Sequence, residues 1–152
     1  MARSVYVAGL GPGVGKGTVA LGLVELLSRQ VARIGVFRPL VSGTGDDDPL
    51  LELLTKRYPV TGSYGVTAAE AGTLVADGKW EELIARIVER YREVERLSAS
   101  VVVIGSDFAV GPVDGPGEHL FVSALRDDMF VGTAGRGRLS LAGLVVGLRD
   151  QN

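Results

Sequence analysis

A run of glycines that ends at a lysine, near the start of the chain, is the segment best suited to chemistry. The run extends from Gly9 to Thr18 and reads Gly-Leu-Gly-Pro-Gly-Val-Gly-Lys-Gly-Thr. Because glycine has no Cβ, backbone N–H groups in such a loop can converge on one point and bind an anion there. Lys16 adds a full positive charge. The composition of the loop therefore predicts a phosphate-binding site.

The segments on either side of the loop are those that phosphate binding requires. Residues 4–8 are apolar and predict a buried strand, and the apolar spacing of residues 16–29 predicts a helix. The helix would direct the positive end of its dipole at the loop. A strand, a glycine loop with lysine and a helix in this order form the context of a P-loop, whereas the alternative is a glycine-rich turn with an incidental lysine. The expected phosphate-binding residues are Gly9, Gly11, Gly13, Gly15, Lys16, Gly17 and Thr18.

The loop departs from the common P-loop pattern at the residue that follows the lysine. The pattern G-x-x-x-x-G-K-[ST] places a hydroxyl there for Mg²⁺. In this chain that position is Gly17, and Thr18 comes one residue later. The spacing from Gly9 to Gly15 is also one residue longer than in the common pattern. We expect ATP or another nucleotide as ligand, with weak or indirect dependence on Mg²⁺.

Carboxylates that would suit a metal ion occur at two places. Asp107 follows the apolar residues 101–104, and Asp46 lies in an acidic loop before Pro49. Carboxylate oxygens are the ligands that Mg²⁺ prefers, so Asp46 and Asp107 are candidate metal ligands. The alternative for Asp46–Asp48 is a solvated loop that caps the helix beginning at Pro49. The alternative for Asp107 is a simple turn at the end of a strand.

A cation follows the second predicted strand. Residues 33–37 predict a short strand that ends at Arg38-Pro39, because the residue before a proline is pushed out of the helical region. The guanidinium of Arg38 has paired donors that suit a phosphate or a carboxylate, and we include it among the ligand-binding candidates. An exposed charge at a strand end is the alternative.

The other hydrophobic patterns predict helices and one more strand. A helix is expected after Pro49, a short helix over residues 67–75, and a long amphipathic helix over 80–97. The continuous β-branched residues 101–104 predict a central parallel strand. In the helix after Pro49 the leucines expected on the inner side are Leu50, Leu51, Leu53 and Leu54.

This order of elements predicts the fold class. Strand, loop, helix, strand, helices and strand are typical of an α/β fold with an open, mostly parallel sheet, the P-loop after the first strand and helices on both faces. Ligands of such sheets bind beyond the carboxyl ends of the strands, where the glycine loop, Arg38 and Asp107 would fall.

The sequence changes character near residue 110. Residues 1–110 carry the patterns above and predict a P-loop nucleotide-binding-like domain. Residues 111–152 are rich in glycine and give no clean period, so we expect an irregular or incomplete C-terminal part. Within it, residues 139–148 are apolar and favour either a strand or a helix.

Composition excludes several classes of site. The chain has no cysteine and one histidine, His119, which excludes disulfides, thiolate zinc sites, cysteine nucleophiles and histidine clusters for metals. A net charge of −2 gives no argument for nucleic acid. No segment approaches the roughly 20 apolar residues of a membrane span. We expect a cytoplasmic protein with neither nucleic acid nor membrane as partner.

Two families resemble parts of this sequence. Residues 11–18 resemble the loop of adenylate kinases, which also place Gly-Thr after the lysine, but the other segments of that family have no good match. Residues 1–108 resemble the N-terminal P-loop domain of long bacterial phosphate acetyltransferases, a domain related to dethiobiotin synthetase. The matching blocks, in order, are residues 5–27, the segment Arg-Ile-Gly-Val-Phe-Arg-Pro at 33–39 with its acidic loop and Leu-Glu-Leu-Leu, and residues 84–91 with 101–108.

The longer resemblance implies regulation and not catalysis. In that acyltransferase family, acetyl transfer between coenzyme A and phosphate belongs to a separate C-terminal domain, and the P-loop domain regulates and supports oligomerisation. It implies a role in acetate metabolism, a homo-oligomeric full-length protein and no catalytic residue in this chain. Since the residues after 110 depart from the family, we expect a truncation, a fragment or a product of a disrupted frame.

Two other classes of function stay open. One is a stand-alone ATP-dependent ligase like dethiobiotin synthetase, or a small P-loop phosphotransferase. The other is a remnant that binds no ligand and only packs against partners.

Overall fold

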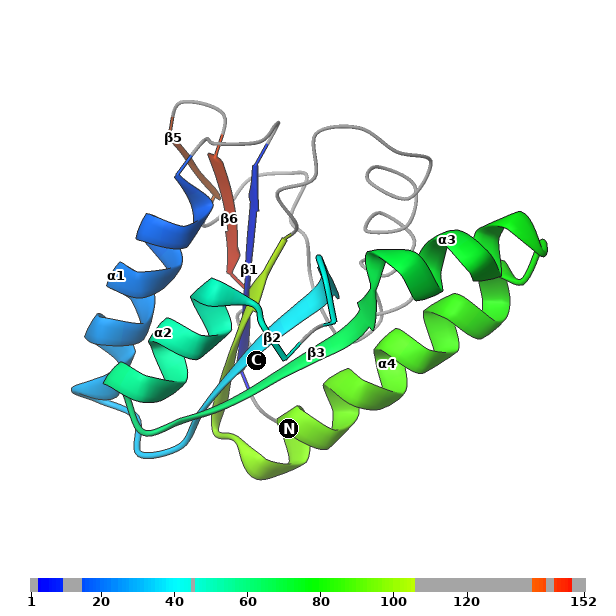
Figure 1. Ribbon diagram of the computed structural model, residues 1–152. Helices are drawn as coiled ribbons and strands as arrows, with labels where there is room; N and C mark the ends of the chain where they lie inside the picture. The colour runs from blue at the N-terminus through cyan, green and yellow to red at the C-terminus, as the bar shows by residue number, and fades with distance from the viewer. Residues whose placement is uncertain (1–2, 10–14, 45, 106–137, 142–143, 149–152) are drawn as a thin grey trace.

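The structure is a computed structural model that describes residues 3–9, 15–44, 46–105, 138–141 and 144–148. These residues form strands and helices that follow one another along the chain (Figure 1). The elements are β1 (Arg3–Gly9), α1 (Lys16–Ser28), β2 (Ile34–Val41), α2 (Pro49–Arg57), β3 (Val60–Thr67), α3 (Ala68–Ala76), α4 (Trp80–Leu97), β4 (Ser100–Ile104), β5 (Arg138–Leu141) and β6 (Leu144–Leu148).

The strands form one sheet in the order β3-β2-β4-β1-β6-β5. The first four of these are parallel to one another. β6 pairs antiparallel with β1, and β5 pairs antiparallel with β6. The prediction of an α/β fold with an open, mostly parallel sheet is therefore confirmed. Of the apolar segment 139–148, left open between strand and helix, the described residues lie in the two antiparallel strands.

Helices cover both faces of the parallel strands, as predicted. Figure 1 shows α1 and α2 on one side of the sheet and α3 and α4 on the other. Successive strand residues point to opposite faces, so neighbours in one strand belong to different cores. Val36 packs in the core under α1 and α2, whereas Phe37 packs in the core under α3 and α4. All of β4 is buried, which explains its uninterrupted β-branched sequence.

The long helix α4 has the bounds that its periodicity predicts. Its buried residues are Leu83, Ile87, Tyr91 and Val94. The ring of Tyr91 meets Phe37 edge to face, with centroids 5.6 Å apart, and its hydroxyl lies 2.5 Å from Ser4 Oγ. On the outer face, Arg86 forms an ion pair with Glu82 at 2.6 Å. One face of the helix thereby contacts β1 and β2, and the other face is exposed to solvent.

The predicted end of the second strand is wrong. β2 continues through Arg38-Pro39 to Val41. The pairing of β2 with β4 ends at Phe37. Beyond that residue, the N–H groups of β2 are not needed for hydrogen bonds to β4. β3 pairs on the other side, with Arg38 opposite Tyr64. A proline is tolerated where a strand lacks a neighbour on one side.

The strand β3 has no counterpart among the predicted elements. Its sequence contains Gly62 and Gly65, and only its last three residues are buried, so it lacks a clear apolar alternation. Gly65 is required by close packing, because a Cβ there would lie 2.4 Å from the carbonyl oxygen of Pro39. The position predicted for Leu53 is also wrong, since that side chain is 48% exposed on the outer face of α2.

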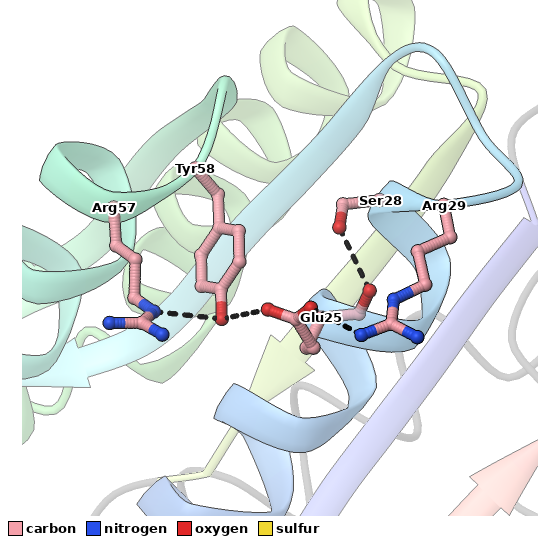
Figure 2. A network of polar contacts seen from close by, with 5 residues as sticks. All are labelled: Glu25, Ser28, Arg29, Arg57 and Tyr58. Carbon is pink, nitrogen blue, oxygen red and sulfur yellow. Dashed lines mark hydrogen bonds and ion pairs between the residues drawn. The ribbon is translucent and has the colours of Figure 1, made fainter.

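A polar network joins the carboxyl-terminal ends of α1 and α2 (Figure 2). The hydroxyl of Tyr58 donates to Glu25 Oε2 at 2.6 Å, and Arg29 Nη2 donates to Glu25 Oε1 at 2.9 Å. Arg57 Nε donates in turn to the Tyr58 hydroxyl at 3.1 Å. The bonds from Tyr58 and Arg29 hold the pKa of Glu25 below its ordinary value of 4.5. This network fixes the ends of the two helices that lie away from the glycine loop.

A search of the helices in the described ranges found none whose length and hydropathy would let it cross a bilayer.

Candidate functional site

The glycine loop joins the end of β1 to the start of α1, as a P-loop requires. β1 ends at Gly9 and α1 begins at Lys16. Gly15 is the N-cap residue of α1 and has a φ of 89°, a left-handed conformation that favours glycine. Its carbonyl accepts the first helical hydrogen bond, from Val19 N at 3.1 Å. Of the predicted phosphate-binding residues, Gly11 and Gly13 lie outside the described residues.

The first turn of α1 contains N–H groups but no acidic side chain that could bind them. In the described part of the chain, α1 has no side-chain cap and no acidic residue in its first turn. By contrast, Asp48 caps α2, and Thr67 caps α3. The first N–H groups of a helix have no partner within the helix, and the helix dipole makes this end attractive to anions. The start of α1 thus suits an external anion.

Lys16 is held inside the protein and not on its surface. Its side chain is only 2% exposed. Gly17 follows at a close approach to α2, since a Cβ there would lie 3.7 Å from Leu50 Cδ1 and Cδ2. Thr18 is exposed. Burial of an ammonium group is costly, so a buried lysine at this position is poorly explained as an incidental surface charge.

A second charged cluster lies at the same carboxyl-terminal edge of the sheet. Arg38 Nη1 donates to Asp48 Oδ2 at 2.7 Å, and Arg38 Nη2 donates to the carbonyl oxygen of Gly105 at 3.2 Å. Both side chains of this ion pair are buried, at 8% and 2% exposure. Asp48 Oδ1 accepts from Leu51 N at 2.9 Å and so caps α2. The interpretation of Arg38 as an exposed charge is excluded by its burial.

This cluster connects three strand ends. Gly105, which accepts from Arg38, donates its own N–H to Val7 O at 2.8 Å. Through these bonds the ends of β1, β2 and β4 and the start of α2 lie together, with the glycine loop following β1. Such an edge is where ligands of open α/β sheets bind. The sequence pointed to Arg38 and to a cap before Pro49, but not to their contact.

The predicted metal ligands are the carboxylates of Asp46 and Asp107. Asp46 is exposed in the segment between β2 and α2, and Asp107 and His119 lie outside the described residues. Asp47 accepts from Thr44 Oγ1 at 2.9 Å. Within the described ranges, no group of three or more acidic or histidine side chains is placed to hold a metal ion. The described donors therefore do not assemble a Mg²⁺ site, and Asp46 and Asp107 stay predictions.

Comparison with known proteins adds independent evidence. A family model described as an AAA domain matches residues 3–115. A phosphate acetyltransferase from Synechocystis sp. is 31% identical over 114 residues, which is 71% of this chain and 16% of that enzyme. A phosphate acetyltransferase from Nitratidesulfovibrio vulgaris is 27% identical over the same shares. An ATP-dependent dethiobiotin synthetase from Sulfurovum sp. is 28% identical over 121 residues, 72% of this chain and 58% of that enzyme.

The extent of these matches decides what they establish. The chain spans 16% of the length of the two phosphate acetyltransferases. No solved structure matched the chain. The family match covers most of the chain and includes β1, the glycine loop and α1. This protein is therefore a member of the AAA domain family, with a P-loop region similar to those of phosphate acetyltransferases and a dethiobiotin synthetase.

Proposed function

We propose that the chain binds the phosphate groups of a nucleotide at the glycine loop. The supporting observation is Lys16, a buried lysine at the start of a helix whose first turn has no acid of its own. Backbone N–H groups and one fixed positive charge are the recurring elements of phosphate recognition in such loops. The proposed contacts are Gly9, Gly11, Gly13, Gly15, Lys16, Gly17 and Thr18. Arg38 as a further contact stays a prediction, because its described partners are Asp48 and Gly105.

We further propose that this domain regulates a phosphate acetyltransferase. The matches to phosphate acetyltransferases from Synechocystis sp. and Nitratidesulfovibrio vulgaris support that assignment. On this proposal the domain senses ATP or another nucleotide and supports homo-oligomer formation in the cytoplasm, while acetyl transfer from coenzyme A to phosphate occurs elsewhere in the enzyme. Neither nucleic acid nor a membrane is a proposed partner.

An ATP-dependent ligase like dethiobiotin synthetase is the second candidate. One observation favours it: the aligned segment covers 58% of the dethiobiotin synthetase from Sulfurovum sp., but 16% of the two phosphate acetyltransferases. Such an ATP-dependent ligase would consume ATP. A regulatory domain would bind the nucleotide and leave it intact.

Calorimetric titration with ATP tests the binding proposal. A charge-assisted contact to phosphate contributes about 1.5–3 kcal/mol, so Lys16→Ala should weaken ATP binding about tenfold or more. Lys79→Ala is a matched control, because Lys79 is an exposed lysine at the start of α4. Its affinity should equal that of the wild type.

The titration, together with an assay of ADP release, separates the candidates. Equal ATP affinity in the wild type and in Lys16→Ala would refute the assignment of the loop. Release of ADP from ATP would favour the ligase. Binding without ADP release is expected for the regulatory domain.

A further inference from the structure

A buried cation and a buried carboxylate meet beside the proposed phosphate site. Arg38 and Asp48 form an ion pair of 2.7 Å, and both side chains are more than nine-tenths buried. Leu50, two residues beyond Asp48, lies against Gly17 at the start of α1. Asp48 is therefore a buried carboxylate close to the first turn of the helix that follows the glycine loop.

Both oxygens of this carboxylate are already engaged. Oδ2 accepts from Arg38, and Oδ1 accepts from the N–H of Leu51 as the cap of α2. A Mg²⁺ ion demands oxygen ligands at about 2.0–2.1 Å in octahedral geometry. The guanidinium of Arg38 offsets the charge of this carboxylate from within the protein.

We propose that Arg38 takes the place of a divalent cation at Asp48 and so makes ligand binding at the glycine loop independent of Mg²⁺. This inference rests on the proposed function, since it concerns the same loop. Gly17 contributes in the same direction, because it has no hydroxyl to ligate a metal. The charge of a bound phosphate is then met by Lys16 and the N–H groups of α1. Arg38 is thus the residue that determines whether ligand binding depends on a divalent cation.

Three variants isolate the charge of Arg38. Arg38→Gln removes the charge and keeps an amide that can donate to Asp48. Arg38→Lys keeps the charge. The double variant Arg38→Gln with Asp48→Asn removes both charges and keeps a side-chain oxygen for the cap of α2. For each folded variant, calorimetry gives the ratio of the ATP dissociation constant in EDTA to that in MgCl₂.

The ratio of dissociation constants is expected to depart from one in a single variant, Arg38→Gln. The wild type, Arg38→Lys and the double variant should give ratios near one, since none of them has an unneutralised carboxylate. Arg38→Gln should give a ratio of about ten or more, the value of one charge-assisted contact. A ratio near one in Arg38→Gln overturns the proposal. A large ratio in the wild type that Asp48→Asn abolishes overturns it as well.

A second readout needs no nucleotide. Thermal unfolding is compared in MgCl₂ and in NaCl of equal ionic strength. Stabilisation by Mg²⁺ of Arg38→Gln alone supports the proposal even if the wild type fails to bind ATP, an outcome that refutes only the proposed function. Equal stabilisation of all variants contradicts the role of Arg38. If Arg38→Gln does not fold, ratios near one for both the wild type and Asp48→Asn support the proposal, and a large ratio for the wild type overturns it.

Discussion

The charged residues near the glycine loop are buried, and each has a different electrostatic situation. Lys16 stands at the positive end of α1, where no acid of the first turn of that helix offsets it. Arg38 instead faces a carboxylate of its own chain. The charge of Arg38 is compensated by that carboxylate. The position of Lys16 at the start of α1 supports it, rather than Arg38, as the main cation of the proposed site.

Gly15 provides a test of backbone conformation in the loop. A Cβ at Gly15 would meet nothing within 4 Å, so Gly15→Ala should destabilise through its left-handed φ of 89° alone. The expected loss is about 1–2 kcal/mol. Gly22→Ala is the control, because Gly22 lies in the middle of α1 with equally open space. That change should stabilise by about 0.5–1 kcal/mol. Urea denaturation measures both, and equal effects would show that the conformation of Gly15 is not strained for alanine.

Asp48 combines an ion pair with a helix cap, and two substitutions separate them. Asp48→Asn keeps the cap but removes the carboxylate charge that faces the buried Arg38, at a cost of about 3–5 kcal/mol. Asp48→Ala removes the cap too and should cost about 1 kcal/mol more. The comparison is Glu52→Gln, which breaks the exposed ion pair with Lys56 and should cost about 0–1 kcal/mol. If Asp48→Asn costs no more than Glu52→Gln in urea denaturation, the buried pair does not stabilise the fold.

At the scale of elements, the helices differ in whether a side chain caps their first N–H groups. α2 and α3 begin with side-chain caps, whereas α1 begins with Gly15. The opposite ends of α1 and α2 are joined by the network of Glu25 and Tyr58 (Figure 2). The two helices are thus fixed at the ends where no ligand is proposed, and the N–H groups of α1 that lack a side-chain cap lie at the end where one is.

The capping box of α3 predicts a dependence of stability on pH. Thr67 N donates to Glu70 Oε2 at 2.9 Å, and this bond, together with the Thr67 hydroxyl, holds the pKa of Glu70 below 4.5 despite partial burial. A carboxyl whose pKa is lower in the folded state stabilises above its unfolded pKa and loses that contribution as pH falls through its folded pKa. The wild type should therefore be more stable than Glu70→Gln at neutral pH, and the difference should disappear below the pKa of Glu70.

Chemical denaturation over a range of pH measures this difference. Glu89→Gln serves as the control, since Glu89 is an exposed glutamate on α4. Its difference from the wild type should stay small at every pH. A Glu70→Gln difference that is constant with pH would show that the capping box does not depend on the charge of the glutamate.

At the scale of the whole molecule, the proposed site lies at one edge of a sheet whose parallel strands have helices on both faces. Attack of phosphate on a thioester requires donors for a developing oxyanion and a group that handles the thiolate. The chain has no cysteine and only one histidine, His119. The proposed regulatory role agrees with this composition.

We accordingly predict that this chain does not form acetyl phosphate from acetyl coenzyme A and phosphate. The measurement is thiol release, and the expected rate equals the background without protein. A full-length phosphate acetyltransferase is the positive control. Turnover by the wild type that is lost in Lys16→Ala would refute both the absence of catalysis and the regulatory proposal.

The sequence by itself determined the features that depend on neighbouring residues. The glycine loop between an apolar strand and a helix, the bounds of α4 and the cap before Pro49 all follow from short-range patterns. Each of these patterns reflects hydrogen bonds or apolar periodicity within a few residues of the chain. The mostly parallel sheet followed from the order of these elements.

The tertiary structure decided the features that depend on residues far apart in the chain. β3 has a weak pattern of its own, and it forms because β2 provides its hydrogen bonds and Gly65 allows close approach to Pro39. The extension of β2 past that proline depends on where pairing with β4 ends. The partner of Arg38 was hidden for the same reason: the ion pair with Asp48 and the bond to Gly105 exist only once a strand end, a helix start and another strand end meet.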